Sequence, residues 1–162
     1  MYIVFQNIYI TNVDSRILSY QDVHEVYSLR WQIELMFKIW KSIFKINRVK
    51  KVKIERFKCF LYGRLIALLL SSTIVFTAKD IILQEDYKEI SDMKSFQKVV
   101  EYFPRLRVEI FEGEIAIIKS LQRLIKVIRK LGVKSKKKNR KTVNEIISLL
   151  KKSESKLEKA II

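Results

Sequence analysis

No glycine or proline interrupts the chain before Gly63, and this long stretch without a helix breaker is the feature that most constrains the fold. Within it, Ser19 is a good N-cap residue. Asp22 stands three residues later, where an acidic side chain completes a capping-box-like pattern. The pattern predicts one long helix that runs from about Tyr20 to Ile46.

Two short segments ahead of this helix have the composition of β-strands. Residues 2–5 and 8–13 are rich in Ile, Val, Tyr and Phe, and the sequence TNVDS supplies turn residues where the second segment ends. We therefore expect one or two strands at the N-terminus. So few strands would not make a sheet that is stable on its own.

Helical patterns occupy most of the remaining chain. Four further helices are predicted, at residues 54–80, at residues 92–103, in a longer segment that ends near Leu131, and in a C-terminal segment that opens at Thr142 and Glu145. Pro104 is expected to end the second of these, and Gly132 the third. Thr142 and Glu145 form a capping box after the loop at residues 134–141.

The most apolar segment, residues 65–78, contains fourteen uncharged residues between Arg64 and Lys79. A helix needs about 20 such residues to span a bilayer, so we interpret the segment as a buried core helix and expect no membrane span. The expected fold is mainly α, an α+β fragment with one or two N-terminal strands followed by about five helices. The expected domains are residues 1–80 and a basic helical region at residues 81–162.

The charge of the chain points to a polyanionic partner. Its 33 Lys and Arg residues against 17 Asp and Glu give a net charge of +16. Residues 30–64 carry eleven basic and two acidic residues, and the sequence KSKKKNRK at residues 134–141 adds a second basic block. Nucleic acid is the first candidate partner and an anionic membrane surface the second.

Several kinds of site are excluded or disfavoured. The single cysteine, Cys59, excludes an internal disulfide and a cysteine-rich metal site, which fits a reducing cytoplasm, and its aromatic neighbours predict a buried thiol. His24 is the only histidine and has no nearby ligand set, so a structural role is favoured over metal binding. Three glycines cannot form a glycine-rich phosphate loop, and the N-terminus lacks the pattern of a signal peptide.

One face of the first predicted helix gathers polar and ionisable side chains. At 100° per residue, an arc of about 80° contains Tyr27, Arg30, Glu34, Lys38, Lys41 and Lys45. Such a stripe suits a run of backbone phosphates. The alternative is an ordinary solvated face, because Glu34 stands four residues from both Arg30 and Lys38, where oppositely charged side chains pair on any helix.

Two, three and six residues separate Tyr27, Arg30, Glu34 and Lys41 in turn. This spacing resembles the Tyr-Arg-Glu-Lys signature of a large group of bacterial DDE transposases encoded by insertion sequences. The surrounding sequences YITNVDS, VYSLRWQIELMFK and IERFKCFLYGRLIALLL also resemble that family. The resemblance is strong over residues 8–70 and weaker over the rest of the chain.

The resemblance implies the C-terminal part of an RNase H-like fold, with residues 1–80 belonging to the catalytic domain. In this family two aspartates and a glutamate hold two divalent ions, normally Mg²⁺, for cleavage and transfer of DNA strands. Glu34 matches the glutamate and would be the catalytic metal ligand.

The resemblance also implies how DNA is held. Arg30 and Lys41 would bind phosphates at the transposon end, and Tyr27 would contribute to contacts with that end. Lys38 and Lys45 are added as DNA contacts from helical geometry alone. The implied partners are transposon-end DNA and another transposase chain, in the cytoplasm and nucleoid of a bacterium.

The chain departs from the family pattern in its aspartates. Asp14 and Asp22 are the only aspartates before Glu34, and they are better explained as a turn residue and an N3 residue. We therefore expect a C-terminal transposase fragment that is inactive by itself and does not bind Mg²⁺ stably. The alternative is a non-catalytic basic helical module that binds DNA, or more weakly an anionic membrane, without any tie to transposition.

Overall fold

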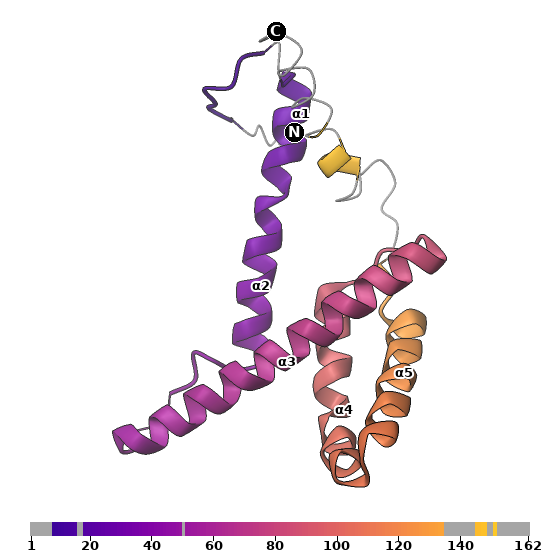
Figure 1. The fold of residues 1–162 in the computed structure, drawn as a ribbon. Coiled ribbons are helices and arrows are strands. Elements are labelled where there is room, and N and C mark those ends of the chain that lie inside the picture. Colours follow the sequence, from indigo (N-terminus) through magenta and orange to yellow (C-terminus); the bar gives the residue numbers. More distant parts are fainter. Residues whose placement is uncertain (1–7, 16–17, 50, 135–144, 149–150, 152–162) are drawn as a thin grey trace, which may run out of the picture. The chain divides into compact units, whose positions relative to one another are not determined.

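The structure is a computed structural model that describes residues 8–15, 18–49, 51–134, 145–148 and 151. Contacts divide the chain into two compact units, Met1–Glu34 with Lys137–Ile162, and Leu35–Lys136. Five helices follow one another along the described chain: α1 (Tyr20–Ser28), α2 (Arg30–Ser42), α3 (Ile54–Asp86), α4 (Asp92–Glu112) and α5 (Glu114–Leu131) (Figure 1). Residues 145–148 are also helical, whereas Thr142, the first residue of the predicted capping box, lies outside the described residues.

The expected N-terminal strands are not found, which corrects the predicted fold class to a mainly helical one. Residues 8–13 are described and form no strand, and residues 2–5 lie outside the described part. A strand needs a neighbour to receive its backbone hydrogen bonds, and residues 8–13 have none among the described residues. Among all the described residues, the only β-type pairing is an isolated bridge between Ile90 and Val133.

The first predicted helix begins where expected but is divided in two. The amide of Asp22 donates to the hydroxyl of Ser19 at 3.3 Å, as a helix N-cap requires. The predicted continuity fails at Leu29, whose amide donates to the carbonyl of Val26, only three residues back. Leu29 keeps right-handed helical dihedrals, so the interruption is a local tightening of the helix.

The second half of this helix ends earlier than predicted, at Ser42. Lys45 has a left-handed φ of 54°, which no α-helix continues. Arg64, on α3, then donates hydrogen bonds of 2.8 Å to the carbonyls of both Lys45 and Arg48. The loop that follows α2 is therefore fixed to α3 by a side chain distant in sequence.

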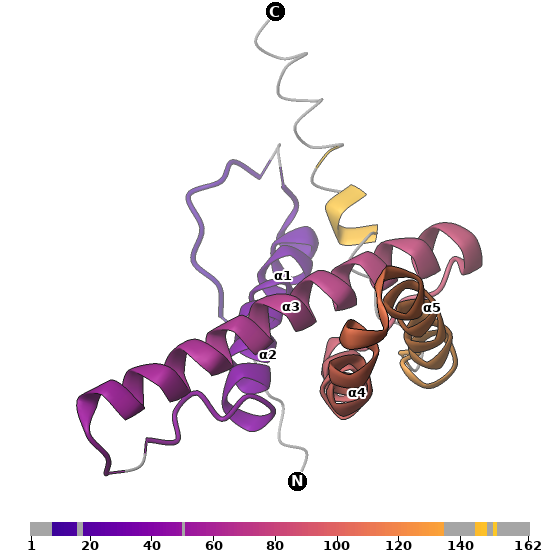
Figure 2. The same ribbon diagram turned by 60° about the horizontal axis from the view of Figure 1, so that its bottom comes forward.

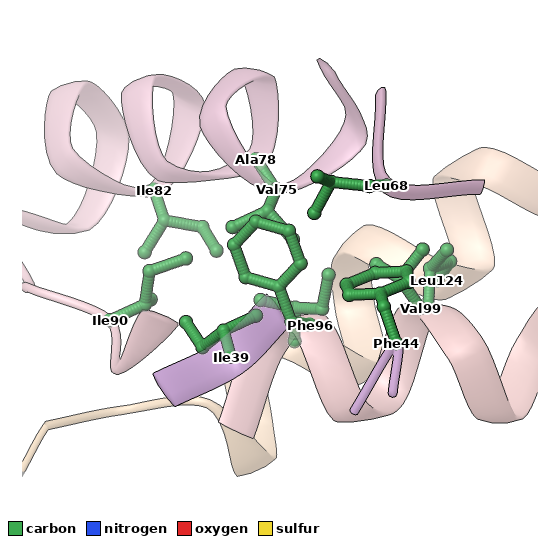
Figure 3. Close-up of a cluster of buried hydrophobic side chains, with 11 residues drawn as sticks. Ile39, Phe44, Leu68, Val75, Ala78, Ile82, Ile90, Phe96, Val99 and Leu124 are labelled. Atoms are coloured by element: carbon green, nitrogen blue, oxygen red, sulfur yellow. The ribbon is translucent and has the colours of Figure 1, made fainter. Parts of the chain in front are cut away.

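The unit Leu35–Lys136 has one continuous apolar core (Figure 3). Its buried members are Ile39, Phe44, Leu68, Val75, Ala78, Ile82, Ile90, Phe96, Val99, Leu124 and Ile128. Phe96 is fully buried at its centre and meets the ring of Phe44 edge to face at 6.0 Å. Helices α4 and α5 form a hairpin on one side of α3, as Figures 1 and 2 both show.

Pro104 does not end α4, contrary to the prediction, and the helix continues to Glu112. Pro104 is exposed, so the hydrogen bond that it cannot make is lost on the solvent side, where water can satisfy the carbonyl. The continuation also carries Glu109, whose carboxylate meets Arg105 at 2.9 Å and Arg123 of α5 at 3.8 Å. Packing against α5 therefore extends the helix past its proline.

The helices of this unit are joined by further ion pairs. Lys79 on α3 meets the largely buried carboxylate of Asp92 on α4 at 3.0 Å. Arg129 on α5 meets Glu85 and Asp86 at the end of α3. The predicted end of α5 at Leu131 is confirmed.

Candidate functional site

The six residues proposed from the sequence fall on different parts of the described chain. Tyr27 lies in the last turn of α1, and Arg30 is the first residue of α2. Glu34, Lys38 and Lys41 follow on α2, and all are exposed. Lys45 is exposed as well but lies beyond the end of α2, so it does not continue the stripe that helical geometry predicted.

Three of these residues form a chain of contacts. The guanidinium of Arg30 donates to a carboxylate oxygen of Glu34 at 2.7 Å. The same guanidinium lies 5.4 Å from the centre of the Tyr27 ring, which is a cation–π distance. Arg30 is thus oriented between an aromatic ring and a carboxylate, with its remaining donors open to solvent.

This arrangement is built mainly from local sequence. Positions 27, 30 and 34 are separated by three and four residues, which brings their side chains onto neighbouring turns of one helical face. The side chains of Arg30 and Glu34 are 61% and 43% exposed, and an exposed pair of this kind contributes no more than about 0.5 kcal/mol to folding. The fold therefore does not depend on the pair, which is free to change partners when a ligand binds.

Tyr9 supports the cluster and was not anticipated from the sequence. Its ring lies 5.0 Å from that of Tyr27, and its hydroxyl is 2.8 Å from Nδ1 of His24 in a hydrogen bond. His24 therefore has a structural contact in this unit, as the sequence suggested. The only signal in the sequence was that His24 and Tyr27 share a face of α1.

A hollow of about 660 Å³ lies beside this contact, between the N-terminal segment and α1. Its lining is largely apolar: Ile8, Tyr9, Ile10, Thr11, Val13, Leu18, Val23, Val26 and Tyr27. It contains no carboxylate, histidine or cysteine among its lining residues, so it lacks the side chains that usually bind a metal ion.

The described residues do not supply a site for a pair of divalent ions. No group of three or more His, Cys, Asp or Glu side chains is found among them. The carboxylate of Asp22 accepts a 2.8 Å hydrogen bond from the hydroxyl of Ser19 at the start of α1, and Asp14 precedes that helix at a turn. Glu34 alone does not fit the ligand set that two ions require, so further carboxylates would have to come from elsewhere.

A basic loop continues the positive charge after α2. Lys45, Arg48, Lys51 and Lys53 are all exposed there. Arg64 fixes the first part of this loop through its bonds to two carbonyls, a role that the sequence did not reveal. The second basic block, residues 134–141, lies outside the described residues except for Lys134, which approaches Glu89 at 3.4 Å.

The thiol of Cys59 is exposed on α3, so the predicted burial is wrong. Its neighbours Phe57 and Phe60 do not enclose it, because successive residues of a helix point in different directions.

Part of the chain matches a known protein family, and most of it aligns with curated relatives. Residues 4–70 match the family model described as "Transposase DDE domain". The chain is 61% identical over 145 residues to a transposase for insertion sequence element IS1151 of Clostridium perfringens, an alignment that covers 90% of this chain and 31% of that protein.

Two further relatives come from Bacillus thuringiensis. Transposases for insertion sequence elements IS231B of subspecies berliner and IS231D of subspecies finitimus are 36% and 38% identical over 144 residues, which covers 89% of this chain and 30% of each relative. The chain thus spans about a third of the length of the curated relatives that it matches. No solved structure matches it.

Proposed function

Because this chain is part of an insertion-sequence DDE transposase, we propose that it is the C-terminal part of one and supplies Glu34 together with a surface that holds DNA. In this proposal residues 1–80 complete the catalytic domain, and residues 81–162 form a basic helical region. The protein acts on DNA in the bacterial cytoplasm and nucleoid.

The contact chain of Tyr27, Arg30 and Glu34 is the observation that carries the proposal. The planar guanidinium of Arg30 suits bidentate binding of a phosphate, and the Tyr27 ring and the Glu34 carboxylate limit its orientation. Lys38 and Lys41 lie about one and two helical turns after Glu34 on α2, and each adds a positive point charge. The exposure of all five side chains leaves them accessible to a DNA backbone.

The family's chemistry is cleavage and joining of DNA phosphodiesters, which bound divalent ions support. Glu34 is the only residue of the cluster that could ligate such an ion. The two further carboxylates would come from another segment of a transposase, either fused to this chain or supplied by a second one. By itself the chain is expected to bind DNA and not to cut it.

The first test uses the chain as it stands. DNA that contains a transposon end is incubated with the purified chain and Mg²⁺, and nicking is followed on a denaturing gel. We expect none. Mg²⁺-dependent nicking that disappears in Glu34→Gln would show that the chain is catalytically complete, and the proposal would then be wrong.

The second test uses a chimera in which this chain replaces the matching segment of the Clostridium perfringens relative. We expect the chimera to cleave end-containing DNA and Glu34→Gln to abolish cleavage while DNA binding is retained. Glu101→Gln is the matched control, because Glu101 forms a similar exposed pair with Lys98 on α4. Equal cleavage by the Glu34→Gln and Glu101→Gln chimeras would remove Glu34 from the reaction and favour a non-catalytic DNA-binding module.

A further inference from the structure

Helix α3 has apolar side chains on two opposite sides, and only one side is covered. The covered side contains Leu68, Ser71, Val75, Ala78 and Ile82, which are buried against the rest of its unit. We call the other side the outer face of α3. It consists of Tyr62, Leu65, Ile66, Leu69 and Leu70, all exposed, with Leu69 at 68%.

Helical geometry separates the two sides cleanly. At 100° per residue, the outer face is centred about 180° from the middle of the buried side. A helix that is apolar around its whole circumference belongs in the interior of a larger protein or in a membrane. A contiguous exposed apolar patch of this kind marks a surface that something else covers.

The length of the outer face indicates what covers it. After Leu70, the corresponding exposed positions are mostly polar, namely Thr73, Thr77 and Asp80, and Phe76 is the one large apolar side chain among them. The match to the transposase DDE domain ends at residue 70, in the middle of the same helix. Most of the uncovered apolar surface thus lies in the part of α3 that the family model matches.

We propose that the outer face of α3 docks onto the remainder of the DDE domain, the part of a transposase that this chain does not contain. The inference rests on the proposed function only in taking the chain as one part of a catalytic domain. The relatives are about three times as long as the matched segment, so they include enough chain to provide such a partner.

A lipid bilayer is a poorer partner for this helix. By length and composition α3 could cross a membrane. However, its other side packs on α4 and α5, and Lys79 near its end pairs with the largely buried Asp92 at 3.0 Å. Insertion would have to carry this ion pair and two amphipathic helices into the bilayer, or break the core that they form.

Thiol labelling at Leu69 tests the proposal. Leu69→Cys is made in a Cys59→Ser background, both in the chain alone and in the chimera with the Clostridium perfringens relative. A maleimide should label Leu69→Cys readily in the chain alone. In the chimera we expect labelling to be at least about tenfold slower, because a covered thiol reacts only when the interface opens.

A matched control shows whether the protection is local. Thr77→Cys, on the same helix beyond the apolar patch and also exposed in this chain, should react within about twofold in the two proteins. Equal labelling of Leu69→Cys in the chain and the chimera would overturn the proposal. Protection of Leu69→Cys in the chain alone would also overturn it. Protection that grows with the concentration of the chain would indicate that a second copy covers the face, and protection on addition of phosphatidylglycerol vesicles would indicate a membrane.

A second variant covers the case in which a cysteine perturbs the interface. Leu69→Glu should leave the midpoint of thermal unfolding of the chain alone nearly unchanged and lower that of the chimera by several degrees. Equal effects in both proteins would contradict docking. DNA cleavage by the chimera is scored separately. Protection at Leu69 together with equal cleavage by the Glu34→Gln and Glu101→Gln chimeras would refute the proposed role of Glu34 and leave the docking surface intact.

Discussion

Replacing Glu34 with glutamine removes one negative charge from the exposed face of α2 and hardly changes the size of the side chain. The Arg30–Glu34 pair is exposed and spaced four residues apart, so its loss should lower the free energy of unfolding by no more than about 0.5 kcal/mol. The helix should therefore remain folded in the variant, and a change in DNA affinity can be attributed to the lost charge.

The size of that effect follows from Coulomb's law. A carboxylate about 7 Å from a DNA phosphate repels it by about 0.6 kcal/mol in water, so its removal should tighten binding about threefold at low salt. At 0.1 M salt the screening length is about 10 Å, and about half of the gain should remain. Arg30→Gln should act oppositely, weakening binding and lowering the slope of log K against log salt by about 0.9 if it loses one phosphate contact.

Fluorescence anisotropy with a labelled end-containing duplex measures these changes over a range of salt concentrations. Glu101→Gln is the control, since it changes the net charge equally and also breaks an exposed helical pair, on α4. The position-specific effect is the difference between the Glu34→Gln and Glu101→Gln variants. If both variants bind alike and Arg30→Gln has no effect, the Arg30 cluster is an ordinary solvated face and does not hold DNA.

Three further predictions concern stability. Phe96→Ala should lower the free energy of unfolding in denaturant by about 3–5 kcal/mol, because the ring is fully buried, and a loss below 1 kcal/mol would contradict the core described for this unit. The nearby Ser120 hydroxyl and Arg105 lower the pKa of Glu109. The ionised carboxylate should therefore contribute fully to the free energy of unfolding at neutral pH, and this contribution should be lost as acid protonates the carboxylate in the folded protein. In Glu109→Gln the free energy of unfolding should accordingly fall less steeply as the pH drops below 5. The same steepness in the variant and the unchanged protein would refute this. Gly132→Ala should lower the thermal midpoint, since a Cβ there would lie 2.5 Å from the carbonyl oxygen of Ile128, and an unchanged midpoint would show that this contact relaxes freely.

The parts of the fold that could be predicted are those set by neighbouring residues. Ser19 and Asp22 specify the start of α1 through their own hydrogen bonds. The end of α5 at Leu131 was placed correctly from Gly132, although that glycine has a φ of −84° and not the left-handed conformation on which the prediction relied. The grouping of Tyr27 and Arg30 with Glu34 was predictable for the same reason, because helical spacing alone brings them together.

The features that were missed depend on contacts distant in sequence. The end of α2, and with it the position of Lys45, is set where Arg64 binds loop carbonyls from the next helix. Helix α4 passes Pro104 because Glu109 meets α5, a contact that no local rule for proline contains. The expected strand at residues 8–13 fails because β structure needs a partner strand, and composition cannot report whether one is present.

The docking proposal also bears on the exposure of Cys59. At 100° per residue, Cys59 lies about 80° from Leu69, between the directions of Ile66 and Leu70. Its predicted burial is wrong for this chain, yet it falls on the side of the helix that the docking proposal covers. An apolar pattern reflects the environment of a residue in the complete protein, whereas exposure here reflects about a third of the length of the relatives. The exposed apolar side chains on this side of α3 are therefore what the docking proposal predicts.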